Sequence, residues 1–132
     1  GIPKTLPALT QAQQIQKRAK RVGFDWNELE PVVAKLQEEI QEFLEADTAA
    51  DRNAEAGDLL FAAVNLIRWL DIDPEMALRD TNERFRKRFS YIEAKAREQG
   101  KSVQELGFAK MDALWEEAKV TFAQEQSRRE LS

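Results

Sequence analysis

The sequence predicts an all-α protein. Apolar residues recur every three or four positions over most of its 132 residues, which is the period of an amphipathic helix. Strand-like alternation is absent, and proline, glycine and capping residues divide the chain into segments of helical length. Two of these segments are joined by a turn too short for anything but antiparallel packing, so we expect a helix bundle. The width of the apolar stripes suggests that dimerisation completes its core.

The first part of the chain predicts an extended lead followed by one helix. Residues 1–7 contain two prolines and no helical period. Residues 8–22 have helical spacing, and Gly23 is expected to end this helix. Its buried stripe is expected to contain five apolar residues, Leu9, Ala12, Ile15, Ala19 and Val22.

Two longer helices are expected next. Asp25 offers an N-cap for a brief turn, with Glu28 placed to complete a capping box. The main helix is then expected over about residues 31–46, because Pro31 is tolerated only in the first turn of a helix. Thr48 can cap the following helix, which should end near residue 70.

The second half of the chain has equally clear boundaries. Asp73 followed by Pro74 predicts a helix start, and Gly100 should end this fourth helix. Its expected buried stripe contains Ala77, Leu78, Thr81, Phe85, Phe89 and Ile92. Ser102 and Glu105 form a capping box for a short turn before the last helix. We expect one helical domain over residues 8–126 and a frayed polar tail over residues 127–132.

Two acidic pairs lie on consecutive predicted helices. Glu39 with Glu42, and Glu55 with Asp58, are each three residues apart, a spacing that places both members on one helix face. At about 100° per residue, each pair borders the apolar stripe of its own helix. Packing the two stripes together would therefore bring four carboxylates to one spot.

Such a cluster is typical of a divalent cation site. Two like charges about 4 Å apart repel by roughly 4 kcal/mol near a protein surface, and carboxylate oxygens suit hard ions such as Mg²⁺ or Mn²⁺. The alternative is that these residues lie on ordinary solvated helix faces. Acidic pairs at this spacing are common in a chain with 24 Asp and Glu residues.

The composition excludes several classes of protein. The formal net charge of −4 gives no basic field for nucleic acid or an anionic membrane. No apolar run approaches the roughly 20 residues that a membrane helix needs, and no signal-peptide pattern opens the chain, so we expect a cytoplasmic protein. The absence of Cys and His excludes thiol catalysis, Ser–His nucleophiles and zinc sites of the usual kinds. The chain begins with Gly, which suggests a fragment of a longer protein.

A basic ridge follows the fourth predicted helix, where Arg84, Arg88, Tyr91 and Lys95 share one face. It is either a solvated face or a row of phosphate contacts.

Several segments resemble, in the same order, the parts of a MazG domain. The acidic pattern Glu38-Glu39-x-x-Glu42, followed by Glu55-x-x-Asp58, is similar to the family signature. Four further segments are similar as well: RVGFDW (21–26), GDLLFAAVNLIR (57–68), NERFRKRF (82–89) and MDALWEEAK (111–119). The resemblance covers roughly residues 6–119 and is greatest to the C-terminal domain of the two-domain bacterial form.

The resemblance implies a dimeric all-α nucleoside triphosphate pyrophosphohydrolase. It would use Mg²⁺, or Mn²⁺ in its place, to release pyrophosphate and leave a nucleoside monophosphate, with broad base specificity, for nucleotide-pool clean-up. The implied metal ligands are Glu39, Glu42, Glu55 and Asp58, and Glu38 joins them in the implied catalytic set although it points away from the stripe. The implied substrate contacts are Lys35, Asn65, Asn82, Arg84, Arg88, Trp115 and Lys119.

Two other classes of function stay open at this point. A non-enzymatic helical dimerisation or interaction module would use the acidic cluster as a structural or vestigial metal site. A nucleic-acid binder that uses the basic ridge is disfavoured by the acidic balance of the chain.

Overall fold

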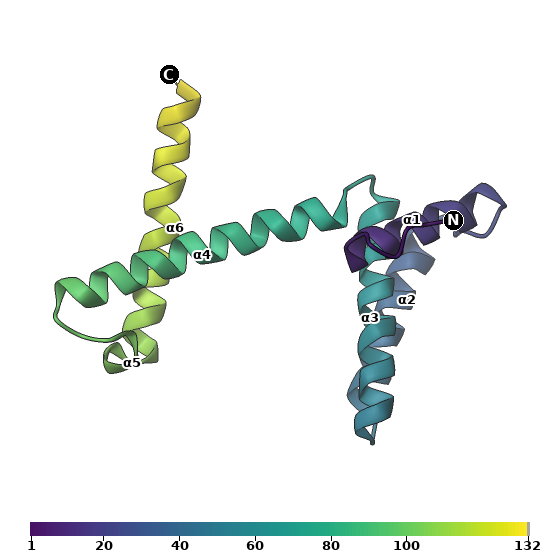
Figure 1. Cartoon of the computed structure of the whole chain (residues 1–132), viewed down its shortest axis with the longest axis horizontal. Coiled ribbons are helices and arrows are strands. Elements are labelled where there is room, and N and C mark those ends of the chain that lie inside the picture. The colour runs from purple at the N-terminus through teal and green to yellow at the C-terminus, as the bar shows by residue number, and fades with distance from the viewer. Residues whose placement is uncertain (132) are drawn as a thin grey trace. The chain divides into compact units, whose positions relative to one another are not determined.

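The structure, a computed structural model, describes residues 1–131 and confirms the all-α prediction. Within that range it contains six helices and no strand (Figure 1). Two compact units divide the chain, residues 1–78 and residues 79–132. The helices are α1 (Ala8–Arg21), α2 (Leu29–Glu45), α3 (Ala49–Trp69), α4 (Pro74–Glu98), α5 (Val103–Leu106) and α6 (Phe108–Leu131).

An antiparallel hairpin of α2 and α3 forms the centre of the first unit (Figure 1). Thr48 caps α3 as predicted, because its hydroxyl accepts a hydrogen bond from the Asp51 backbone at 3.1 Å. The buried apolar residues of this unit are Val32, Ala62 and Val64, and α1 packs against α3. The two helices with the acidic pairs are therefore neighbours.

The buried face of α1 differs from the predicted stripe. Gln13 and Gln16 are buried, whereas Ile15 and Val22 are exposed by 47 % and 84 %. The reason is a polar contact with α3, since the Gln16 side-chain amide donates to the backbone carbonyl of Phe61 at 2.9 Å. Hydrophobic periodicity alone does not detect such a contact.

The connection between α1 and α2 was predicted correctly at its start and wrongly at its end. Gly23 follows the end of α1 at φ 91°, and the backbone of Phe24 donates to Ala19, which completes a helix C-cap. Asp25 is not an N-cap, because α2 begins at Leu29 and the Asp25 carboxylate pairs with Arg68 instead. Pro31 becomes the third residue of α2, where its missing N–H costs nothing.

The second unit has its own small core. Ile92 and Ala96 of α4 pack with Leu106 of α5, and Met111 and Trp115 of α6 cover them. The predicted stripe of α4 is buried only toward its C-terminal end, since the side chains of Phe85 and Phe89 are 56 % and 36 % exposed. The capping box of Ser102 and Glu105 is present as predicted.

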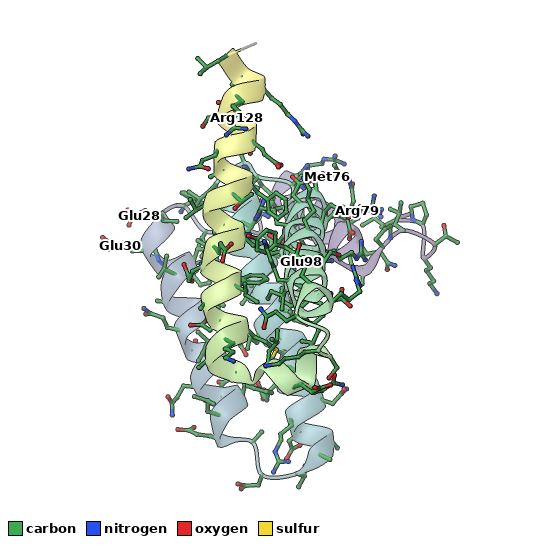
Figure 2. All side chains as sticks on the ribbon, turned by 90° about the vertical axis from the view of Figure 1, so that its left-hand side faces the viewer. Glu28, Glu30, Met76, Arg79, Glu98 and Arg128 are labelled. Atoms are coloured by element: carbon green, nitrogen blue, oxygen red, sulfur yellow. The ribbon has the colours of Figure 1, made fainter. Side chains whose placement is uncertain are left out.

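Residues 127–131 of the predicted polar tail are helical rather than frayed, and residue 132 lies outside the described residues. The last helix continues to Leu131, and Arg128 lies near its end (Figure 2). Gln126 donates to Glu130 at 3.3 Å, an i, i+4 contact that supports the last turns. None of the helices within residues 1–131 is both long and apolar enough to cross a bilayer.

Candidate metal centre

Three of the four predicted metal ligands meet where α2 lies beside α3. Glu39 and Glu42 of α2 and Glu55 of α3 each offer a carboxylate oxygen, and these oxygens lie within 4.8 Å of one another. Asp58 is not in this group. It is exposed one turn further along α3 and lines a cavity that Glu39 also lines.

Glu42 is exposed, but the burial of the carboxylate oxygens of Glu39 and Glu55 fits a cation site. Glu39 is only 6 % exposed, and its Oε2 atom has no hydrogen-bond partner among the described residues. The Oε2 atom of Glu55 is buried without a described partner as well. A buried oxygen without a partner is costly, and a divalent cation with oxygen ligands removes that cost. The residues present therefore fit Mg²⁺.

Lys35 partly neutralises the cluster. Its ammonium lies 3.1 Å from Glu39 and 3.6 Å from Glu38. The hydrogen bond to Glu39 is the main reason that the pKa of Lys35 is raised, followed by the charge of Glu38. The pKa of Glu42 is also raised, first by the negative charge of Glu39 and then by burial and the charge of Glu55. The cluster thus favours the uptake of positive charge.

A cavity of about 620 Å³ adjoins the cluster and is built wholly from the first unit. Its walls come from α1, the α1–α2 connection, α2 and α3, and they include Lys35, Glu39, Asp58 and Asn65 from the predicted site. The sequence prediction did not assign several other lining residues to the site, among them Gln16, Asp25, Trp26, Phe61 and Arg68. Asp25, Trp26, Phe61 and Arg68 lie in two segments that resemble a MazG domain, residues 21–26 and 57–68, whereas no sequence signal indicated Gln16.

Arg68 is the centre of a buried network in this wall. Its guanidinium donates to Asp25 at 3.0 Å and to the Oδ1 atom of Asn65 at 2.5 Å and 3.1 Å. The side chains of Arg68 and Asp25 are 5 % and 12 % exposed. Nearby, the Trp69 indole donates to the backbone carbonyl of Trp26 at 3.4 Å. The α1–α2 connection is therefore fixed to the last turn of α3.

The remaining predicted substrate contacts lie in the second unit. The Arg88 guanidinium lies 5.4 Å from the centre of the Trp115 ring, which Phe85 also contacts. Arg84 donates to Thr81 at 2.9 Å, Lys119 pairs with Glu116 at 3.3 Å, and Asn82 is exposed. A contact of any of these residues with substrate stays a prediction.

Comparison of the sequence with known proteins places the chain in a family. The sequence profile described as phosphoribosyl-ATP pyrophosphohydrolase matches residues 8–85, which include the acidic cluster and the cavity. The chain is 44 % identical over 114 residues to "Nucleoside triphosphate pyrophosphohydrolase/pyrophosphatase MazG" of Thermotoga maritima, covering 86 % of this chain and 45 % of that protein.

Two further relatives give similar values. "Nucleoside triphosphate pyrophosphohydrolase" of Escherichia coli K12 is 45 % identical over 123 residues, which cover 89 % of this chain and 47 % of that protein. "Uncharacterized protein YabN" of Bacillus subtilis is 48 % identical over 125 residues, covering 92 % of this chain and 26 % of that protein. The chain thus spans about half the length, or less, of these relatives. It belongs to the phosphoribosyl-ATP pyrophosphohydrolase family, among its MazG-like members.

Proposed function

We propose that the chain hydrolyses nucleoside triphosphates to a nucleoside monophosphate and pyrophosphate with the help of Mg²⁺. The observation that carries this proposal is the pair of buried carboxylate oxygens, on Glu39 and Glu55, that have no described partner beside a cavity. The names of the two relatives described as nucleoside triphosphate pyrophosphohydrolases support the same reaction.

Glu39, Glu42 and Glu55 would hold the cation, with Asp58, which lines the adjoining cavity, as the fourth ligand. A cation held there would supply positive charge to the triphosphate and would make a nearby water molecule more acidic. Attack of that water on the α-phosphorus breaks the bond to the bridging oxygen, and pyrophosphate leaves.

The other predicted residues would bind and orient the reactants. Lys35 lies beside Glu39 and would contact a phosphate oxygen of the substrate. Glu38 is exposed next to Lys35, a position suited to orienting water. Arg84 and Arg88 would bind the departing pyrophosphate, because a guanidinium forms paired hydrogen bonds with phosphate oxygens. Asn82, Trp115 and Lys119 would complete the substrate contacts.

The test is pyrophosphate release from a panel of nucleoside triphosphates at fixed Mg²⁺. Replacing Glu42 or Asp58 by Ala should abolish turnover and leave the helical circular-dichroism signal unchanged. Glu45→Ala is the matched control, since Glu45 lies exposed on the same helix outside the cluster. The proposal fails if the unaltered protein releases no pyrophosphate from any common or modified triphosphate.

A Mg²⁺ titration of thermal stability separates this enzyme from a non-enzymatic module with a structural metal site. A structural site would be stabilised by Mg²⁺ alone, without turnover. For a catalytic site we expect weak stabilisation by Mg²⁺ alone and a larger shift when a non-hydrolysable triphosphate is added. A homodimer, broad base specificity and a cytoplasmic location complete the proposal.

A further inference from the structure

The wall of the cavity presents a fixed hydrogen-bond donor. Two N–H groups of Arg68 donate to the Oδ1 atom of Asn65, so the Asn65 amide cannot rotate without losing both bonds. Asp25 holds the same guanidinium from the other side. The Asn65 NH₂ group has no hydrogen bond to any described residue, and Asn65 lines the cavity. Its amide is thus set to donate to an occupant.

An unpartnered acceptor lines the same cavity. Gln16 is 6 % exposed, and its NH₂ group donates to the Phe61 carbonyl, which fixes the orientation of its amide too. The Oε1 atom of Gln16 is buried without a partner among the described residues. One donor from α3 and one acceptor from α1 therefore belong to a single pocket.

The other walls favour a flat, uncharged occupant. Trp26 and Phe61 supply aromatic surface, and the charge of Arg68 is already paired with Asp25. The charged residues Lys35, Glu39 and Asp58 belong to the part of the cavity that adjoins the acidic cluster. A volume of about 620 Å³ lies in the usual range for small-ligand sites. A nucleobase has this chemistry, since it combines π-faces with donors and acceptors along its edge.

We infer that the cavity binds the base of the nucleotide and that Asn65 recognises it through a hydrogen bond to an acceptor atom on the base edge. The inference rests on the proposed function, because a triphosphate at the acidic cluster would place its base beside that cluster. Arg68 and Asp25 act as positioning residues for the amide. Every base carries an acceptor atom, so the contact fits broad specificity.

The test measures KM and kcat of the Asn65→Asp variant for nucleoside triphosphates and for ribose 5′-triphosphate, which has no base. An aspartate keeps an oxygen that accepts from Arg68 and replaces the NH₂ donor by a second carboxylate oxygen, and its negative charge lies beside the Arg68 guanidinium. We expect KM for the nucleotides to rise about tenfold with kcat nearly unchanged, and KM for the base-free substrate to stay constant. Asn53→Asp, at an exposed position on the same helix, should behave as the unaltered protein.

A second variant keeps the inference testable if Asn65→Asp does not fold. Ile15 lines the cavity but is 47 % exposed, so Ile15→Trp should fill the cavity without disturbing the core. This variant should raise KM for nucleotides and leave KM for ribose 5′-triphosphate unchanged. The inference is overturned if the variants change KM for both kinds of substrate by the same factor, or change KM for neither. If the unaltered protein cleaves no triphosphate, it is the proposed function that fails.

Discussion

Arg68 shows how a buried charge is accommodated in a small protein. Its guanidinium forms hydrogen bonds with Asp25 and Asn65, which occupy most of its donors. A buried ion pair adds little net stability, because desolvation of the two charges offsets their attraction. Its importance here is positional, since it fixes both the α1–α2 connection and the Asn65 amide.

Breaking this pair from one side should be strongly destabilising. In Arg68→Met the Asp25 carboxylate, only 12 % exposed, loses its counter-ion, and we expect the free energy of unfolding to fall by about 3 kcal/mol. The double variant Asp25→Asn, Arg68→Met should regain much of that loss, because neither charge remains. Urea denaturation measures all three proteins.

The matched control for this cycle is Arg86→Met. Arg86 pairs with Glu83 at 3.2 Å, but both side chains are more than 60 % exposed, so the loss should be below about 1 kcal/mol. Equal losses for Arg68→Met and Arg86→Met would contradict the argument from burial.

Helix geometry predicted the acidic cluster because the spacing of Glu39, Glu42 and Glu55 is a local property. Once the turn between α2 and α3 fixes the hairpin, the border positions of the two helices meet. The partnership of Asp25 with Arg68 joins residues 43 positions apart, and no local pattern indicates it. Gln16 was missed for the same reason, since its partner is a backbone carbonyl on another helix.

Most helix boundaries were predictable because they depend on neighbouring residues. Thr48 caps α3, while Gly23 and Gly100 follow the ends of α1 and α4 in the left-handed conformation. The end of α6 was predicted too early. Polar residues such as Gln126 and Arg128 are good helix formers, so an exposed segment of this kind continues the helix without apolar spacing.

The start of α5 gives a prediction about pH. Glu105 accepts hydrogen bonds from the Ser102 backbone at 3.2 Å and from its hydroxyl at 3.0 Å, and these bonds, the backbone one first, lower the pKa of Glu105 from 4.5. A lowered pKa in the folded state means that the charged carboxylate stabilises the fold. This contribution is present above pH 4.5 and is lost as the pH falls through the lower folded-state value.

Glu105→Gln should therefore lower the midpoint of thermal unfolding at pH 6 and have a smaller effect near pH 3. Glu125→Gln, at an exposed position of α6, is the control, and its effect should not vary with pH in this way. A Glu105→Gln effect of constant size between pH 3 and pH 6 would show that the carboxylate charge does not contribute to the cap.

The chain exposes apolar surface on its helices, as the width of its apolar stripes predicts. On α2, Ile40 and Leu44 are 43 % and 69 % exposed, and on α3 Leu60 is 60 % exposed. Ile40 and Leu44 lie four residues apart and share one face of the helix. No described residue covers these side chains fully. Contiguous apolar patches on soluble proteins commonly mark interaction sites, which supports the proposed homodimer.

Light scattering coupled to size-exclusion chromatography tests this proposal directly. The unaltered protein should elute with twice the 15.2 kDa chain mass, because pairing of two copies would bury the Ile40 and Leu44 face. In the double variant Ile40→Lys, Leu44→Lys, charges on that face should weaken association about 100-fold and shift the population toward single chains at micromolar concentration. Val22→Lys changes an 84 % exposed residue of another segment and should leave the mass unchanged. A single-chain mass for the unaltered protein at high concentration would contradict the dimer, and the exposed face would then need a different partner.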